Sequence, residues 1–530
     1  MAEHNKRTPW LPIFFSLVMV LGIFIGYELR DNTGYGSILS KPSSSSVAEV
    51  LKLIQSKYVD DVAIDSISTN VINDLLASLD PHSSYIPADE IAEVNDEIMG
   101  NFQGIGIEYQ LINDSLNVIS ILPEGPAKKA GLLTGDICVK ANDSIKLSGA
   151  HIKPEQIRKY LRGLNGSNLK ITVFRNGKQK DFNIQRSVIN VPSVDATYLV
   201  DSVTGYIHVN KFTEQTHLEF MKSLDTLNKQ HISKLIVDLR GNGGGLMDAA
   251  AQIADEFLTG EKIIVYTEGV HSKRINYTCR KDGMFEEGKL IVLVDETSAS
   301  ASEVLTGALQ DWDRATIVGR RSFGKGLVQQ QFMLSDGSAV RLTTAKYYTP
   351  LGRNIQKPYH KDKEQYKEEI FNRYHHQSQQ DNYDSFKLTA KTYKTPKGHI
   401  VYGGGGITPD YNVPFDTTIM HTIYAKLVAN DMLNIFAYRW YISNSNSFSA
   451  IKDYKTIQQI FSSNKTWWND LQIFARLHNI DVAGATEKDK ERIRINIESF
   501  IAHILLNKSA SIQIINQDDE TVLKAIELIK

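Results

Sequence analysis

The segment KLIVDLRGNGGGLMDAAAQIADEF, residues 234–257, carries the pattern that decides the fold. An apolar run ends in a glycine-rich loop, and a helical pattern follows whose apolar side comprises Leu246, Ala250, Ile253, Ala254 and Phe257. This order predicts a buried strand, a loop and a helix. The match to a dinucleotide-binding fingerprint is weak, because Leu246 occupies the third glycine position. Such a loop before a helix N-terminus is equally suited to pointing backbone amides at a developing oxyanion.

The same order recurs in KLIVLVDETSASASEVLTGALQDW, residues 289–312, where Ser298, Ser300 and Ser302 precede a helical pattern. Ser300 and Glu303 fit a capping box, which explains one serine as a helix-entry residue. At the first turn of a helix Ser300 is also placed as a nucleophile, because the positive end of the helix dipole stabilises an alkoxide-like oxygen. The two interpretations are compatible, since one N-terminal position supplies both roles.

Residues 315–350 predict a strand, a glycine loop and a hairpin that turns at Asp336 and Gly337. Lys325 lies in this loop between two glycines, where a lysine is usually a solvated charge. Here it interrupts a segment that is otherwise apolar enough to be buried. Burial disfavours the ammonium form, so a neutral amine becomes available as a general base.

Residues 101–187 consist of short strands and glycine turns, with helical patterns at 124–136 and 154–164. This texture predicts a small half-barrel with a groove between a strand and a helix. It resembles a PDZ domain of the circularly permuted bacterial kind. The sequence GIGI, which is Gly104, Ile105, Gly106 and Ile107, stands in the place of the loop that holds a peptide's terminal carboxylate. The alternative is a β-rich packing module that binds nothing.

The N-terminus predicts a membrane anchor. Lys6 and Arg7 precede an uncharged run from Trp10 to Tyr27, and about 18 residues is the lower limit for a spanning helix. Positive charge before the run predicts that everything after Glu28 is exported, which places the catalytic part in the cell envelope or periplasm. A cleaved signal peptide is the alternative, but no A-x-A-like site follows. Residues 1–31 are therefore expected to form an inner-membrane anchor, and the Gly- and Ser-rich residues 32–46 a tether.

Composition excludes several classes of function. The 530 residues predict more than one structural unit, and 42% hydrophobic and 23% charged residues are typical of a globular protein. A net charge of −2 offers no electrostatic reason for a nucleic-acid partner. Cys138 and Cys279 match no metal-ligand, CxxC or disulfide pattern. We therefore expect no metal and no redox chemistry.

The flanking segments are mostly helical in pattern. Apolar stripes at 47–58 and 64–79 predict two amphipathic helices within a helical segment 47–98, and they end at the prolines of LDPHSSYIP. His82 in that turn could be a ligand or a base, although a lone histidine after a helix is more often structural. Residues 357–397, which include His375 and His376, are interpreted as a solvated insertion, with metal binding as the minor alternative. Helical spacing at 417–441 and 467–530 predicts a helical C-terminal domain, residues 413–530.

Several motifs together resemble the carboxy-terminal processing, or tail-specific, proteases from about residue 47 to 412. They are LDPHSSY at 79–85, DLRGNGGG at 238–245, SASASE at 298–303, FGKGLVQ at 323–329, YYTPLGRNIQ at 347–356 and GGGGITPD at 403–410. The resemblance implies an α/β (α+β multidomain) protein. Its crotonase-like protease core of stacked strand–helix turns would span residues 189–412, with an inserted PDZ-like domain at 99–188.

The resemblance also implies a role for individual residues. Ser300 is the nucleophile, Lys325 the base, and Gln329 positions the lysine. Backbone amides of Ala301 and Gly244 would bind the oxyanion, although Gly243, where many members carry proline, loosens this loop. The implied reaction is peptide-bond hydrolysis through an acyl-enzyme, and it requires no cofactor, metal or histidine.

The implied partners are proteins with accessible C-terminal tails, which the PDZ-like groove would capture. A homo-oligomer or an adaptor is compatible with the sequence. Two alternatives remain: a coenzyme-A acyl enzyme, because the core arrangement is shared, and a catalytically silent peptide-binding scaffold. An exported location without an evident cofactor counts against the first. The intact set of Ser300, Lys325 and Gln329 counts against the second.

Overall fold

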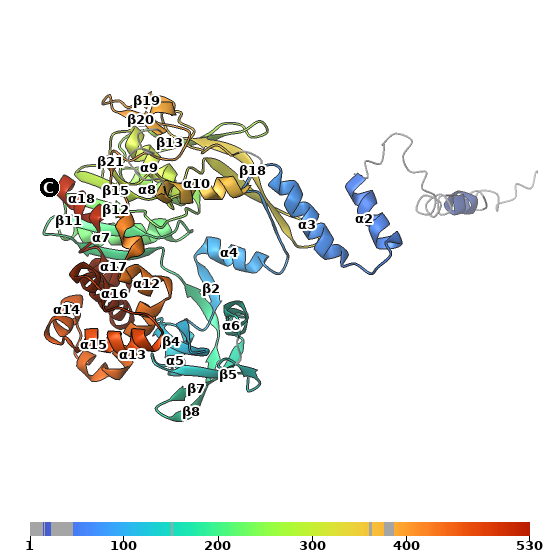
Figure 1. Cartoon of the computed structure of the whole chain (residues 1–530). Coiled ribbons are helices and arrows are strands. Elements are labelled where there is room, and N and C mark those ends of the chain that lie inside the picture. Colours follow the sequence, from blue (N-terminus) through green and yellow to red (C-terminus); the bar gives the residue numbers. More distant parts are fainter. Residues whose placement is uncertain (1–13, 15, 23–45, 150–151, 360–362, 376–385) are drawn as a thin grey trace, which may run out of the picture. The chain divides into compact units, whose positions relative to one another are not determined.

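The computed structural model describes residues 14, 16–22, 46–149, 152–359, 363–375 and 386–530. Contacts divide the chain into two compact units, Met1–Leu75 and Leu76–Lys530. The helices α2 (Ser46–Lys57) and α3 (Ile64–Ala77) confirm the two helices predicted from the apolar stripes. Figure 1 shows the elements coloured along the sequence, with labels on most of them.

The predicted anchor, residues 1–31, lies outside the described residues apart from Phe14 and residues 16–22. The predicted tether lies outside them apart from Ser46. In the described ranges, no helix combines the length and the apolar character that a bilayer crossing requires.

The central sheet of the second unit has six strands. β10 runs antiparallel to β11, and the other neighbours are parallel. Parallel strands are normally buried on both faces, which fits the Val- and Ile-rich sequences of this sheet. The strands, in spatial order, are β10 (Val194–Leu199), β11 (Thr204–Val209), β12 (Lys234–Asp238), β15 (Lys289–Val294), β16 (Thr316–Gly319) and β21 (Tyr411–Asn412).

Helices cover both faces of this sheet. Leu235 and Val237 belong to one apolar cluster and Ile236 to another, as alternation along a strand requires. The first cluster includes residues of α7 (Thr216–Asn228), α8 (Met247–Asp255) and α9 (Ala301–Asp311). The units β12–loop–α8 and β15–turn–α9 confirm the two predicted strand, loop and helix segments, and with them the α/β class.

The helices of the C-terminal segment pack into two different apolar clusters. Val522, Ala525 and Ile529 of α18 (Glu520–Ile529) are buried in the second cluster against the central sheet. α17 (Lys508–Ile515) contributes Ile514 to the helical domain's own core. That core is otherwise formed by α12 (Ile423–Ala429), α13 (Met432–Ser443), α14 (Tyr454–Ser463), α15 (Thr466–Leu477) and α16 (Glu487–Leu505). The final helix therefore completes the α/β core instead of presenting a free surface.

A second sheet carries the hairpin that follows the glycine loop of Lys325. The hairpin strands are β17 (Leu327–Met333) and β18 (Ala339–Tyr348). Gly337 has a φ of +85°, as the predicted turn requires. The sheet also contains β1 (Ser84–Ile86), β13 (Ile263–Glu268) and β14 (Ile275–Thr278). Because β1 pairs with β18, the LDPHSSY turn reaches the hairpin.

The PDZ-like region forms its own sheet with an available edge. β2 (Asn101–Gly104) precedes the strands of this sheet in the chain, and β9 (Ser187–Asn190) follows them. The two pair with each other as an antiparallel ribbon. The strands of the sheet, in order, are β3 (Ile107–Ile112), β4 (Ser115–Ile121), β5 (Ile137–Ala141), β7 (Asn168–Arg175) and β8 (Lys178–Gln185), with β6 (Ile145–Lys146) beside β5. Two helices pack on it, α5 (Pro126–Ala130) and α6 (Pro154–Leu161). Within the described ranges β4 is the only strand paired with β3.

Candidate active site

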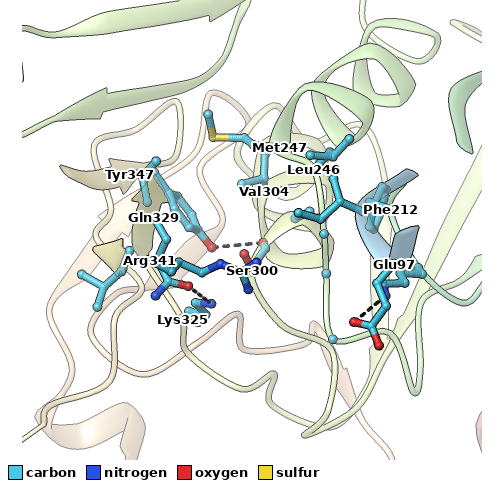
Figure 2. Close-up of a pocket in the computed structure, with 18 of the residues that line it drawn as sticks. Glu97, Phe212, Leu246, Met247, Ser300, Val304, Lys325, Gln329, Arg341 and Tyr347 are labelled. Atoms are coloured by element: carbon cyan, nitrogen blue, oxygen red, sulfur yellow. Dashed lines mark hydrogen bonds and ion pairs between the residues drawn. The ribbon is translucent and has the colours of Figure 1, made fainter. Parts of the chain in front are cut away.

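Ser300 lies at a sharp turn between β15 and α9. It is the N-cap residue of α9 and has a φ of +57°, which is uncommon for a residue other than glycine. Strained backbone of this kind concentrates at functional sites, where the surrounding structure maintains it. Ser300 and Lys325 line one cavity of about 620 Å³ (Figure 2).

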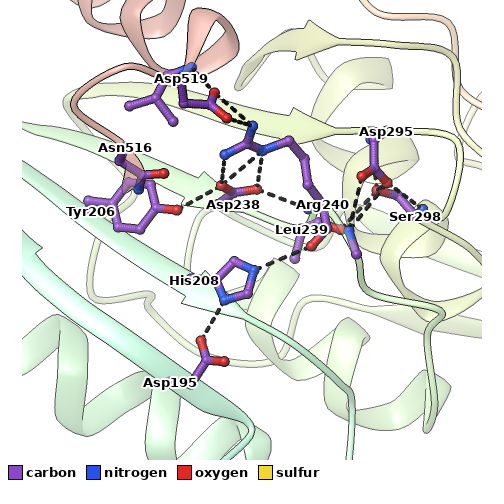
Figure 3. Close-up of polar contacts among 12 residues, drawn as sticks. Asp195, Tyr206, His208, Asp238, Leu239, Arg240, Asp295, Ser298, Asn516 and Asp519 are labelled. Atoms are coloured by element: carbon purple, nitrogen blue, oxygen red, sulfur yellow. Dashed lines mark hydrogen bonds and ion pairs between the residues drawn. The ribbon is translucent and has the colours of Figure 1, made fainter. Parts of the chain in front are cut away.

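The other two serines of the triplet hold this turn. The Ser298 hydroxyl donates to Leu239 O at 2.8 Å, and the Ser302 hydroxyl donates to Asn242 O at 2.9 Å. Asp295 accepts from the Gly241 amide at 3.2 Å, and Figure 3 shows Asp295 and Ser298 beside the end of β12. The serine turn and the glycine loop are therefore cross-linked.

Glu303 is the polar centre of the site. Its Oε2 accepts the backbone N–H of Ser300 at 2.8 Å and that of Lys325 at 2.9 Å. Its Oε1 accepts from the Ser322 hydroxyl at 2.5 Å and the Gly324 amide at 2.7 Å. Burial raises the pKa of Glu303 to about 7, although these hydrogen bonds favour the charged form. The capping-box pattern predicts the bond to Ser300, but sequence reasoning missed the bonds to the lysine loop.

Lys325 is half-buried, and its Nζ donates to Gln329 Oε1 at 2.9 Å. Burial lowers the pKa of Lys325, and the charge of Arg341 lowers it further, whereas Glu303 and Asp80 act in the opposite direction. Gln329 is held in turn, because its Nε2 donates to the backbone oxygen of His82 at 2.5 Å. In the part of the chain that the structure describes, Lys325 Nζ forms no hydrogen bond with the Ser300 hydroxyl.

His82 contributes its backbone oxygen to the site. Its ring Nε2 is 2.9 Å from the Tyr366 hydroxyl, and the ring packs edge-on against Tyr366. Asp80 holds the turn by accepting from the amides of His82 and Ser83, each at 2.8 Å. Among the described residues no cluster of His, Cys, Asp and Glu is suited to a metal ion.

The glycine loop approaches Ser300 closely. Gly244 has a φ of +98°, and a Cβ on it would lie 2.6 Å from Ala299 O and 2.8 Å from Ser300 Cβ. Its amide donates to Asn242 Oδ1 at 2.8 Å, so this predicted oxyanion donor is engaged within the loop. The Ala301 amide has no hydrogen-bond partner in the described ranges. Gly243 lines the same cavity, and a Cβ there would meet nothing within 4 Å.

The rest of the cavity combines apolar and charged side chains. Its apolar members are Phe212, Leu246, Met247, Val304, Leu327, Val328 and Tyr347. Helix α4 (Ile91–Met99), which the sequence analysis did not distinguish, adds Val94 and Ile98. Glu97 of the same helix pairs with Lys211 at 3.7 Å. Tyr347 donates from its hydroxyl to Ser300 O at 3.2 Å, which further fixes the serine turn.

The segment 357–397, which the sequence predicts to be a solvated insertion, is not solvated throughout its described part. Lys357 and Tyr366 are buried. Arg373 of α10 (Lys363–His375) donates to the backbone oxygens of Ser322 at 2.8 Å and Arg321 at 3.0 Å. Carbonyls that would otherwise need water are thereby satisfied, so α10 supports the loop before Lys325. His376 lies outside the described residues.

Comparisons with known proteins match two regions of the chain. Residues 203–364 match the peptidase family S41, and residues 103–185 match the PDZ domain. A carboxy-terminal-processing protease of Bartonella bacilliformis is 37% identical over 314 residues, 58% of this chain and 71% of that protein. A probable CtpA-like serine protease of Staphylococcus epidermidis is 31% identical over 362 residues, 67% of this chain and 72% of that protein.

The chain belongs to peptidase family S41. This S41 member is a serine-type peptidase with a PDZ domain, and the match favours the peptidase over the alternatives of a coenzyme-A acyl enzyme and a silent scaffold. The solved structure of a photosystem II D1 C-terminal processing protease is also similar. It has 28% sequence identity and a TM-score of 0.35, covering 59% of this chain and 83% of that one.

In the PDZ domain of this S41 peptidase, β3 and α6 share one apolar cluster. Ile107, Tyr109 and Leu111 of β3 pack into the same apolar cluster as Ile157 and Leu161 of α6. The loop of Ile105 and Gly106 comes directly before β3. Neither amide of this loop donates to another backbone group in the described ranges. The opposite side of β3 contacts the helical domain, where Glu108 Oε2 lies 2.6 Å from His503 Nε2.

Proposed function

We propose that this peptidase captures the C-terminal residues of protein substrates in its PDZ domain and cleaves their peptide bonds with Ser300. The observation that carries the proposal is that Ser300 and Lys325 lie together in the wall of one cavity. Both line one cavity, and both are fastened by the buried Glu303. A neutral lysine held by Gln329 is suited to act as a general base toward a serine at a helix N-terminus.

In the proposed reaction the Lys325 amine accepts the Ser300 proton while the serine oxygen attacks a backbone carbonyl of the substrate. The tetrahedral intermediate collapses to an acyl-enzyme as the C–N bond breaks, and the Lys325 ammonium gives its proton to the leaving amine. The Lys325 amine then accepts a proton from water while the water oxygen attacks the acyl carbonyl. The ester bond to Ser300 breaks, the Lys325 ammonium returns its proton to the serine oxygen, and the new carboxyl terminus is released. Gln329 keeps the lysine side chain directed into the cavity.

We propose that the Ala301 amide and an amide of the glycine loop stabilise the oxyanion. Ala301 N–H lies at the start of α9, where the helix dipole adds to its effect. Gly244 serves as the second donor if Asn242 Oδ1 releases its amide in the substrate complex. Gly243 is the alternative, and a Gly243→Pro variant, which lacks this N–H, distinguishes the two.

For substrate capture we propose that a tail pairs with the open edge of β3. Its terminal carboxylate would bind the amides of the loop Gly104, Ile105, Gly106 and Ile107. Apolar side chains shared by β3 and α6 favour an apolar final residue. A tail that ends in an amide lacks the carboxylate and should bind more weakly.

We also propose that the catalytic part is exported and remains attached to the inner membrane by residues 1–31. The support is Lys6 and Arg7 ahead of the uncharged run from Trp10 to Tyr27. Fractionation of the full chain and of a chain that begins at residue 47 tests this placement. The proposed boundaries are 32–46 for the tether, 47–98 for the helical segment, 99–188 for the PDZ domain, 189–412 for the core and 413–530 for the C-terminal domain.

The decisive assay uses a folded reporter with an unstructured apolar tail that ends in a free carboxylate. We expect the full chain to degrade this reporter, and Ser300→Ala or Lys325→Ala to abolish cleavage while tail binding persists. Lys346→Ala, which changes an exposed lysine on β18, is the matched control and should retain activity. Turnover by Ser300→Ala or Lys325→Ala would contradict the proposed mechanism.

A further inference from the structure

Arg341 lies on the same sheet face as the residue that holds the proposed base. In the β17–β18 hairpin, Gln329 pairs with Thr343 and Gln331 pairs with Arg341. Diagonal neighbours in such a pair are about 7–8 Å apart at the backbone, within reach of long side chains. Gln329, Gln331 and Arg341 all line the cavity of Lys325, and Figure 2 shows Arg341 beside Gln329.

The charge of Arg341 is not neutralised by the cavity wall. Its guanidinium donates to Gln331 Oε1 at 3.4 Å, a long contact with a neutral group. In the described residues no carboxylate forms an ion pair with Arg341. The other cation of the cavity, Lys211, does have such a partner in Glu97.

The acidic groups that face Lys325 form hydrogen bonds or ion pairs with other groups. Glu303 accepts four hydrogen bonds, and burial raises its pKa to about 7, so its negative charge is only partly developed at neutral pH. Asp80 is turned to Ser83, whose hydroxyl donates to it at 2.6 Å, and to the backbone of its own turn. The Glu97–Lys211 pair is largely solvated, and the His82 ring is directed to Tyr366.

We propose that the fixed positive charge of Arg341 holds Lys325 in its free-amine form, which makes Arg341 a positioning residue of the reaction. A second positive charge in a half-buried cavity is unfavourable while the first remains, so the lysine gives up its proton more readily. Burial and then Arg341 lower the pKa of Lys325, in agreement with the geometry. This inference rests on the proposed role of Lys325 as the base.

The test is the pH dependence of kcat/KM for the full chain and its Arg341 variants. We expect Arg341→Gln to move the acid limb of the kcat/KM profile to higher pH by about half a unit to one unit. The plateau at high pH should stay the same. Arg341→Lys keeps the charge and should keep the wild-type limb. Lys211→Gln is the matched control, because it removes a paired cation from the same cavity and should leave the limb in place.

A direct titration keeps the test independent of turnover. Nitrogen-detected NMR of the Lys325 amine in a Ser300→Ala background, with and without Arg341→Gln, should show the same upward shift. If Arg341→Gln shifted neither the acid limb of the kcat/KM profile nor the titration of the Lys325 amine, the proposal would be overturned. A rise in KM confined to acidic substrates, without a shift, would also overturn it and assign Arg341 to substrate binding. If Lys325→Ala itself retains turnover, the proposed function fails instead, so the two failures are distinguishable.

Discussion

Ser300 and Lys325 donate their backbone N–H groups to the same atom, Oε2 of Glu303. One buried side chain thus connects the turn of the serine to the loop of the lysine. The second oxygen of Glu303 binds the same loop through Gly324 and Ser322. The relative position of the proposed nucleophile and the proposed base is therefore set by a residue that need not touch the substrate.

Glu303→Gln should lower kcat strongly. An amide places an NH₂ group against N–H donors, and an unsatisfied buried donor costs about 1–3 kcal/mol. We expect a loss of about 10–100-fold in kcat, since about 1.4 kcal/mol corresponds to a factor of ten. The control is Glu296→Gln, a buried carboxylate whose partner is Arg320 at 2.7 Å. Equal kcat losses in the two variants would argue against the bridging role.

Gln329→Glu should move the acid limb of kcat/KM to higher pH. A carboxylate beside the Lys325 amine stabilises the ammonium, which raises the pKa of Lys325 and delays the appearance of the base. We expect a shift of about one unit upward. Gln330→Glu places the same charge on an exposed neighbour and should leave the profile unchanged. A downward shift in Gln329→Glu would contradict the expected contact.

The glycine loop offers a matched pair of substitutions. Gly244→Ala should abolish activity, because its Cβ would lie 2.6 Å from Ala299 O at a φ of +98°. Backbone strain of this kind costs about 1–3 kcal/mol before any steric shift. Gly243→Ala should remain active, since nothing lies within 4 Å of its Cβ. Cleavage assays together with thermal unfolding separate loss of activity from loss of the fold.

Asp519 joins the last helix to the glycine loop and has two separable roles. It accepts from the Val522 amide at 2.9 Å as the N-cap of α18, and it pairs with Arg240 at 2.8 Å (Figure 3). Asp519→Asn keeps a good cap but loses the charge of the pair, so kcat should fall with little change in unfolding free energy. Asp519→Ala should also lose about 1 kcal/mol of stability. Identical behaviour of the two variants would contradict this division.

Arg373→Gln should lower kcat without changing affinity of the PDZ domain for a tail peptide. The guanidinium binds the backbone oxygens of Arg321 and Ser322, and it pairs with Glu369 at 2.8 Å. Against the raising effect of burial, the charge of Arg373 lowers the pKa of Glu369 to about 2. The ion pair of Glu369 with Arg373 therefore stabilises the fold at pH values above the ordinary pKa of a carboxyl group. This stabilisation is lost as the pH falls toward about 2. Asn372→Ala, at an exposed neighbour, is the control, and peptide binding measured calorimetrically is the second readout.

Much of the local structure was predictable because it depends on neighbouring residues. Periodicity in 234–257 and 289–312 predicts the strand, loop and helix units that the structure contains. The polar pattern of residues 357–375 did not reveal the buried part of this segment, because Arg373 binds the backbone oxygen of Ser322, 51 residues away in sequence. The packing of α18 against the central sheet was not predictable, because helical spacing does not reveal which surface a helix covers.

The sequence by itself determined the order of strands and helices and the helix start at Ser300, since these follow from periodicity, caps and glycine turns. Only the tertiary structure decided what surrounds the lysine. The His82 oxygen that holds Gln329 lies 247 residues away, and Glu303 reaches the Lys325 loop across the fold. Burial, partners and nearby charge set the behaviour of an amine, and they depend on the path of the whole chain.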